Sequence, residues 1–181
     1  MKKNKNVVII SSSPRINGNS DVLCQQFRKG AESAGNKVTY INLANYNLGY
    51  CIGCYACSHT GKCYQNDGMN EISEALEKAD VIVFGTPVYF YSMSGQLKVF
   101  IDRLVPMYTK VKADIYMIIT AADEEVANLE ATAEAIRGLT RDCFEGCDEK
   151  GVLLAPALTD RGEVLSHREY LSMALEMGAN C

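Results

Sequence analysis

Residues 7–20 read VVIISSSPRINGNS, and the character of the sequence changes twice along this stretch. Val7 to Ile10 is a short, continuous run of β-branched residues, which is typical of a strand buried on both faces of a parallel sheet. A hydroxyl-rich turn follows, and a helix is expected to begin there with Asn19 or Ser20 as its capping residue. The stretch therefore predicts a buried strand that enters a helix through a polar loop.

The same alternation continues to the end of the chain. Further apolar runs predict buried strands at 81–84, 115–119 and 152–154, and the mixed polarity of 37–43 predicts a strand at a sheet edge. Apolar residues with helical spacing lie between the strands, at 23–34, 69–79, 97–104 and 126–136. A last helix is expected to begin at a capping box on Ser166 and to end near Gly178. Five strands alternating with five helices predict a three-layer, doubly wound α/β fold with a parallel sheet.

Length and composition restrict the class of protein. A chain of 181 residues that is 48% hydrophobic and 22% charged predicts one domain over residues 1–181. The net charge of -4, without a basic stripe, argues against nucleic acid as a partner. No apolar run approaches the roughly 18 residues of a membrane span, and the run behind the basic start is too short for a signal peptide. We therefore expect a cytoplasmic protein without a membrane partner.

In an open parallel sheet, ligands bind outside the carboxyl ends of the strands. The first such loop, Ser11 to Ser20, joins hydroxyl groups to a helix N-terminus, where free backbone N–H groups attract an anion. It contains neither G-x-G-x-x-G nor G-x-x-x-x-G-K-[ST], so we predict a phosphate monoester that is held rather than cleaved. The alternative is an ordinary polar loop with a capped helix.

The segment Gly85 to Gly95 is predicted to be a second loop at the same edge. It carries three aromatic residues and a methionine, which suits a flat aromatic ligand lying against them. The alternative is that these aromatic residues pack under the following helix.

Two blocks carry a resemblance to a known family: SPRINGNS at 13–20 and TPVYFYSMS at 86–94, the latter followed by LKVFIDR at 97–103. They resemble the phosphate loop and the ring-contacting loop of the flavodoxin-like NAD(P)H-dependent FMN reductase superfamily. The resemblance implies a five-stranded sheet in the order 2-1-3-4-5, tightly held FMN, NAD(P)H as a transient co-substrate, and a homodimer or homotetramer.

The resemblance also implies where FMN binds. The phosphate group is expected on Ser11, Ser13, Asn19 and Ser20, with added charge from Arg15. The ring is expected against Pro87, Val88, Tyr89, Phe90 and Ser92, with Thr120 and Ala121 at its other rim. Flavin chemistry belongs to the cofactor, so we nominate no catalytic acid or base.

Eight cysteines are an unusual number for such a chain, and Cys51, Cys54, Cys57 and Cys63 cluster in a cysteine-rich loop at about 50–67. The spacing C-x2-C-x2-C-x5-C suits a cubane cluster. It resembles the iron–sulfur flavoproteins, a branch of the same superfamily that carries a [4Fe–4S] cluster beside FMN. A similar pattern also occurs in relatives described as FMN reductases, and Asp67-Gly68-Met69 stands where Asp-Asp-Met is frequent. The spacing alone does not decide between a cluster, a disulfide and free thiols.

The other four cysteines, Cys24, Cys143, Cys147 and Cys181, are predicted to be buried small hydrophobes or, for Cys181, a tail thiol. His59 and His167 are predicted to be surface residues.

Three functions remain open. The first is an FMN-dependent oxidoreductase that passes electrons from NAD(P)H to a flavin, quinone, nitro or related small-molecule acceptor. The second is an electron carrier that uses FMN and a [4Fe–4S] cluster with a ferredoxin-type protein partner. The third is a non-enzymatic module that senses flavin or metal.

Overall fold

The computed structural model describes residues 4–181, so the first part of the basic N-terminal start lies outside the described residues. Five parallel strands form one sheet in the order β2-β1-β3-β5-β6. Numbered among themselves, they follow the predicted order 2-1-3-4-5. The strands are β1 (Asn6–Ser11), β2 (Lys37–Asn42), β3 (Val81–Tyr89), β5 (Asp114–Thr120) and β6 (Asp148–Ala155), and β4 (Ser92–Met93) pairs antiparallel with β3.

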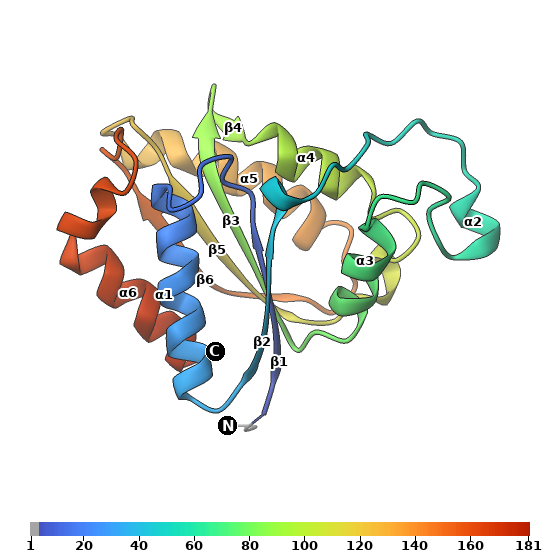
Figure 1. Ribbon diagram of the computed structural model, residues 1–181, viewed down its shortest axis with the longest axis horizontal. Helices are drawn as coiled ribbons and strands as arrows, with labels where there is room; N and C mark the ends of the chain where they lie inside the picture. The colour runs from blue at the N-terminus through green and yellow to red at the C-terminus, as the bar shows by residue number, and fades with distance from the viewer. Residues whose placement is uncertain (1–3) are drawn as a thin grey trace.

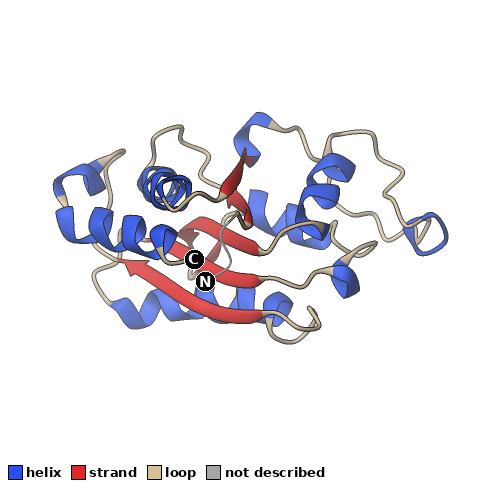
Figure 2. Cartoon of the chain, turned by 90° about the horizontal axis from the view of Figure 1, so that it is seen from below, coloured by secondary structure: helices blue, strands red, loops and turns tan. Residues whose placement is uncertain are grey.

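Helices cover both faces of the sheet (Figures 1 and 2). The helices are α1 (Asn19–Ser33), α2 (Cys57–Thr60), α3 (Met69–Glu77), α4 (Gly95–Asp102), α5 (Val126–Thr140) and α6 (Arg168–Ala179), with short 3-10 helices η1 (Leu43–Asn45), η2 (Tyr108–Lys110) and η3 (Glu163–Ser166). α1 and α6 lie on one face, and α3, α4 and α5 lie on the other. None of the helices in residues 4–181 is long and apolar enough to cross a bilayer.

The period of two in β1 explains the three layers. Val7 and Ile9 pack with α1 and α6, whereas Val8 and Ile10 pack with α3 and α4 on the other face. All four side chains are buried, as the continuous apolar run predicts. β2 pairs only with β1 and therefore lies at the predicted sheet edge.

Both ends of the last helix differ from the prediction. The capping box is wrong, because α6 begins at Arg168 with His167 at its N-cap, and the Ser166 hydroxyl donates to Glu163 O instead. Gly178 lies inside α6 rather than after it. A β-carbon on Gly178 would lie 2.0 Å from Phe27 O in α1, and one on Gly30 would lie 2.0 Å from Leu175 O. These glycines allow the two helix backbones to touch.

The second predicted loop is also different. β3 continues through Tyr89 because Gly85, Thr86 and Pro87 remain paired with β5. The chain then turns at Phe90 and Tyr91 into β4. The aromatic segment is therefore a hairpin extending from the sheet, not a loop.

Candidate functional site

A cavity of about 240 Å³ opens at the carboxyl ends of the strands, and we call it the edge cavity. The loops after β1, β5 and β6 contribute to it, together with the end of β3. Its lining is Ser13, Arg15, Gly18, Asn19, Ser20, Pro87, Val88, Tyr89, Thr120, Ala121, Ala122, Leu158 and Thr159. Nine of the twelve residues predicted to bind FMN therefore meet at one cavity.

The start of α1 provides the polar end of the edge cavity. Gly18 occupies the N-cap, and no side chain caps the helix, contrary to the capping role expected for Asn19 or Ser20. The first-turn N–H groups of a helix lack intrahelical partners and attract anions. The Ser20 hydroxyl is buried in the same place and has no hydrogen-bond partner. A phosphate group supplies the acceptor oxygens that these donors lack, so the residues fit the phosphate end of FMN.

Position 18 requires glycine because the loop after β1 folds closely against it. A β-carbon at this position would lie 2.6 Å from Ser13 Oγ and 3.0 Å from Arg15 O. The Ser13 hydroxyl donates to Arg15 O at 2.8 Å, and the Arg15 side chain reaches Thr159 O at 3.4 Å. Contacts within the loop after β1 and with Thr159 therefore hold this loop in a tight fold.

The other end of the edge cavity is apolar. Pro87, Val88 and Tyr89 approach from β3, and Ala121 approaches from the end of β5. Phe90 and Tyr91 both have positive φ, +49° and +59°, as the central residues of a two-residue hairpin turn require. The backbone of a residue other than glycine is strained at these φ angles, and the Phe90 side chain is also fully exposed. This hairpin gives a flat ring an aromatic and aliphatic surface.

Three predicted contacts lie outside the lining of the edge cavity. The Ser11 hydroxyl donates to Asp21 at 2.8 Å, Ser92 is exposed on β4, and Phe90 lines a neighbouring hollow with Tyr91. Asn19 lies in the lining, but its side-chain amide donates to Leu158 O and Asp160 O and its oxygen accepts from Val164 N. The Asn19 side chain therefore holds the loop after β6.

Sequence reasoning missed the buried carboxylate of Asp21, in the first turn of α1. It accepts hydrogen bonds from Ser11 Oγ, Tyr40 OH at 2.6 Å, Asn42 Nδ2 at 3.0 Å and Asn17 N at 3.0 Å. Burial raises the pKa of Tyr40, and Cys24 and Asp21 add to the shift, so Tyr40 remains a donor. The only sequence signal was an acidic residue in the first turn of a helix. Asp21 joins the loop after β1 to the ends of β1 and β2.

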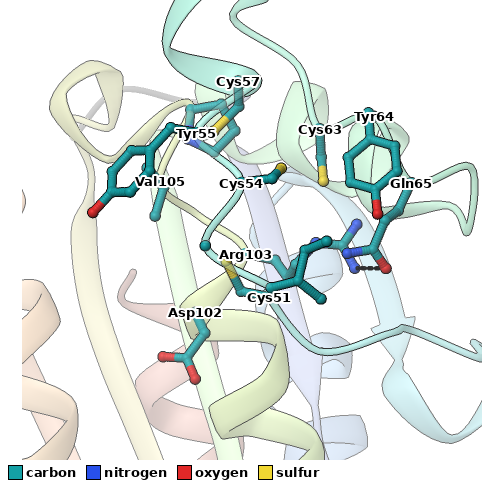
Figure 3. A pocket seen from close by; sticks show the side chains of 13 residues that line it. Cys51, Cys54, Tyr55, Cys57, Cys63, Tyr64, Gln65, Asp102, Arg103 and Val105 are labelled. Carbon is teal, nitrogen blue, oxygen red and sulfur yellow. Dashed lines mark hydrogen bonds between the residues drawn. The ribbon is translucent and has the colours of Figure 1, made fainter.

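A second cavity, of about 130 Å³, lies in the cysteine-rich loop, and we call it the cysteine cavity. It is lined by all four clustered cysteines together with Arg103 (Figure 3). Cys51 and Cys54 are exposed and Cys57 and Cys63 are half-buried, and no two of the eight cysteines, all within residues 4–181, form a disulfide. Within residues 4–181, no three His, Cys, Asp or Glu side chains already surround one metal position.

The segment around Asp67 fixes the base of this loop. Asp67 receives hydrogen bonds from Arg103 Nη1 at 2.8 Å and Nη2 at 3.0 Å, which hold the pKa of the Asp67 carboxyl below its ordinary value. Asn70 accepts from Cys63 N and donates to Cys63 O, both at 2.9 Å. Gly68 has a φ of +87°, and a β-carbon there would lie 2.9 Å from the Tyr46 ring. Glycine at the position where Asp is frequent therefore suits this turn.

The remaining cysteines and histidines follow the prediction in part. Cys24 and Cys181 are buried as predicted and Cys147 is half-buried, but Cys143 is exposed, so its predicted burial is wrong. His59 is exposed on α2, and His167 contacts Glu169 and stacks on Tyr170. Neither histidine lines the cysteine cavity.

Comparison with known proteins shows the family and several relatives. A family model described as NADPH-dependent FMN reductase matches residues 5–138. An iron–sulfur flavoprotein of Methanocaldococcus jannaschii is 40% identical over 101 residues, which are 56% of this chain and 52% of that protein. An iron–sulfur flavoprotein of Archaeoglobus fulgidus is 34% identical over 97 residues, which are 54% of this chain and 44% of that protein. The chain thus spans about half the length of these curated relatives.

Solved structures share the fold over almost the whole chain. An NAD(P)H:quinone oxidoreductase from Methanothermobacter marburgensis has a TM-score of 0.72 at 18% identity, covering 98% of this chain and 96% of its own. An FMN-dependent NADH-azoreductase from Bacillus anthracis, in complex with FMN, has a TM-score of 0.70 at 14% identity, covering 97% of this chain and 98% of its own. At such identities the likeness shows the flavodoxin-like fold.

Proposed function

The chain belongs to the NADPH-dependent FMN reductase family, and on that premise we propose that it is an FMN-dependent oxidoreductase that takes electrons from NAD(P)H. The observation that carries the proposal is the buried, unpartnered Ser20 hydroxyl at the uncapped start of α1. It lies in a cavity whose other end is the apolar segment Pro87 to Tyr89. One end of this cavity suits a phosphate group and the other suits a flat ring.

The residues of the edge cavity bind and orient the cofactor. Ser13, Ser20 and the backbone of the loop hold the phosphate group, Arg15 adds positive charge, and Asn19 fixes the neighbouring loop. Pro87, Val88 and Tyr89 support one side of the ring, while Thr120 and Ala121 lie at its other rim. When bound, FMN supplies the hydride and electron chemistry, so no side chain need act as acid or base.

The acceptor is proposed to be a small flavin, quinone, nitro or related compound. The strained hairpin at Phe90 and Tyr91 supports this choice, because it exposes aromatic surface beside the cavity for a second planar molecule. We also propose that the chain forms a homodimer or homotetramer in which a second subunit lies beside this surface.

The test begins with the absorption spectrum of protein purified without oxygen. We expect flavin bands, and we expect NADPH or NADH to bleach them and a quinone to restore them. Protein that holds no flavin and that added FMN cannot reconstitute would overturn the proposal.

A second candidate function rests on the cysteine cavity. Four free thiols that line one cavity provide the donor chemistry of a [4Fe–4S] site, and such a cluster passes single electrons to and from a flavin. Because no metal position is already formed, binding a cluster requires the thiols to close around it. The chain would then exchange electrons with a ferredoxin-type protein.

The same spectrum separates the two candidates. A broad additional absorption that dithionite bleaches, together with faster flavin reduction by reduced ferredoxin than by NAD(P)H, supports the electron carrier. Flavin bands alone support the reductase.

A further inference from the structure

Arg103, at the end of α4, is the charged residue that holds the neck of the cysteine-rich loop. Its guanidinium contacts both sides of this neck: Nη1 donates to Gly49 O before the loop, and Nη1 and Nη2 donate to the Asp67 carboxylate at its end. Gly49 N also donates to Asp67 at 3.0 Å. The side chain of Arg103 is only 1% exposed, although charged residues are rarely buried to this degree.

We call these contacts of Arg103 with Gly49 and Asp67 the clamp, and they use only the Nη groups of the guanidinium. Nε of Arg103 is buried and has no hydrogen-bond partner. A buried donor on a cation is costly to leave unpaired, and native structures rarely do so without a functional reason. A purely structural clamp would be complete with the two Nη groups.

The unpartnered donor belongs to a residue that lines the cysteine cavity (Figure 3). Hydrogen bonding to Asp67 is the main cause that raises the pKa of Arg103, burial opposes it, and nearby Cys63 contributes in the same direction as Asp67. Cys63 is also the cysteine whose backbone Asn70 holds on both sides. A cysteine with a fixed backbone and an unpaired donor therefore lie beside the same cavity.

We propose that Arg103 is a positioning residue of the cysteine cavity, whose Nε–H donates to the Cys63 sulfur when the four thiolates hold an iron–sulfur cluster. This inference rests on the second candidate function. Four thiolates carry more negative charge than the iron–sulfur core carries positive charge, and the guanidinium offsets part of the excess. Hydrogen bonds to sulfur and nearby charge are among the factors that set a cluster's potential.

The experiment compares the wild type with the double variant Arg103→Gln/Asp67→Asn after anaerobic reconstitution with iron and sulfide. The double change removes the donor while leaving the net charge of the pair unchanged. We expect the cluster of the double variant to have a more negative midpoint potential, because its reduced form loses a hydrogen bond. Arg103→Lys, which keeps the charge but loses the planar fork, is expected to lie between the two. FMN binding at the edge cavity reports folding in every variant.

Two further outcomes separate the inference from the function on which it rests. Equal midpoint potentials in the wild type and the double variant would overturn the inference and leave the electron carrier intact. A wild type that takes up no cluster would overturn the electron carrier. In that case Cd²⁺ binding, followed by thiolate-to-metal absorption, tests the role of Arg103 at the thiolates without a cluster. We expect about tenfold weaker Cd²⁺ binding in the double variant, on the scale of one hydrogen bond to a charged group. Equal Cd²⁺ affinity would overturn the inference in that case also.

Discussion

The edge cavity and the cysteine cavity are ordered by different means. The edge cavity is formed where four parallel strands end and α1 begins, and four of its polar residues, Ser13, Asn19, Ser20 and Thr120, are buried. The cysteine-rich loop contains only the four-residue helix α2, and Cys51 and Cys54 are exposed on it. Contacts such as the pair of Arg103 and Asp67, 36 residues apart, and the Asn70 amide on Cys63 hold it. One site depends on regular secondary structure, and the other depends on a few specific contacts.

The largest expected effect comes from removing the clamp. Arg103→Ala leaves the Asp67 carboxylate, 14% exposed, without its cation, and we expect a loss of about 3–5 kcal/mol in the free energy of unfolding. Urea denaturation at 25 °C measures it. Lys98→Ala is the matched control on α4, because its ion pair with Asp102 is exposed. A loss below about 1 kcal/mol for Arg103→Ala would show that water replaces the cation, and that the loop does not depend on the clamp.

A smaller effect is expected at the edge cavity, on binding rather than on folding. Ser20→Ala removes a hydroxyl that has no protein partner, so the free energy of unfolding should hardly change. Loss of one hydrogen bond to a charged phosphate group should weaken FMN binding about 10- to 100-fold. Flavin fluorescence titration measures the affinity.

Ser73→Ala is the matched control for this comparison. Ser73 Oγ is likewise buried and without a partner, but it lies on α3 and outside the lining of the edge cavity. We expect unchanged FMN affinity in this variant. Equal affinity in the wild type and Ser20→Ala would contradict the phosphate position.

The same contrast explains what the sequence could predict. The apolar runs of β1, β3 and β5 and the loop after β1 follow from local patterns, and the strand order follows from the family resemblance. The extension of β3 through Pro87 depends on pairing with Thr120 of β5, which no local pattern near Gly85 shows. Local spacing could not have found the Arg103 clamp either, although both partners lie in segments singled out for their resemblance to known families.

Acidification should weaken the ion pair of Arg103 and Asp67 at the base of the cysteine-rich loop. Hydrogen bonding to Arg103 lowers the pKa of Asp67 in the folded state, so the pair stabilises the fold above the unfolded carboxyl's pKa of about 4. This stabilisation is lost as the pH falls from about 4 toward the folded-state value. We therefore expect the wild type to lose more stability between pH 5 and pH 3 than Arg103→Gln/Asp67→Asn, as measured by urea midpoints. Parallel pH profiles would contradict the assignment.

The smallest effect is expected from the other ion pair of the cysteine-rich loop. Lys62 Nζ and Glu74 Oε1 lie 2.9 Å apart, but the two side chains are 65% and 53% exposed. Water solvates both charges whether or not they pair, so the short distance adds little to the free energy of unfolding. Lys62→Ala should therefore leave the urea midpoint within error of the wild type, at low salt and at high salt. A shift comparable to that of Arg103→Ala would mean that the loop is held from its outer side. That result would contradict the explanation that Arg103 matters to this loop because its ion pair is buried.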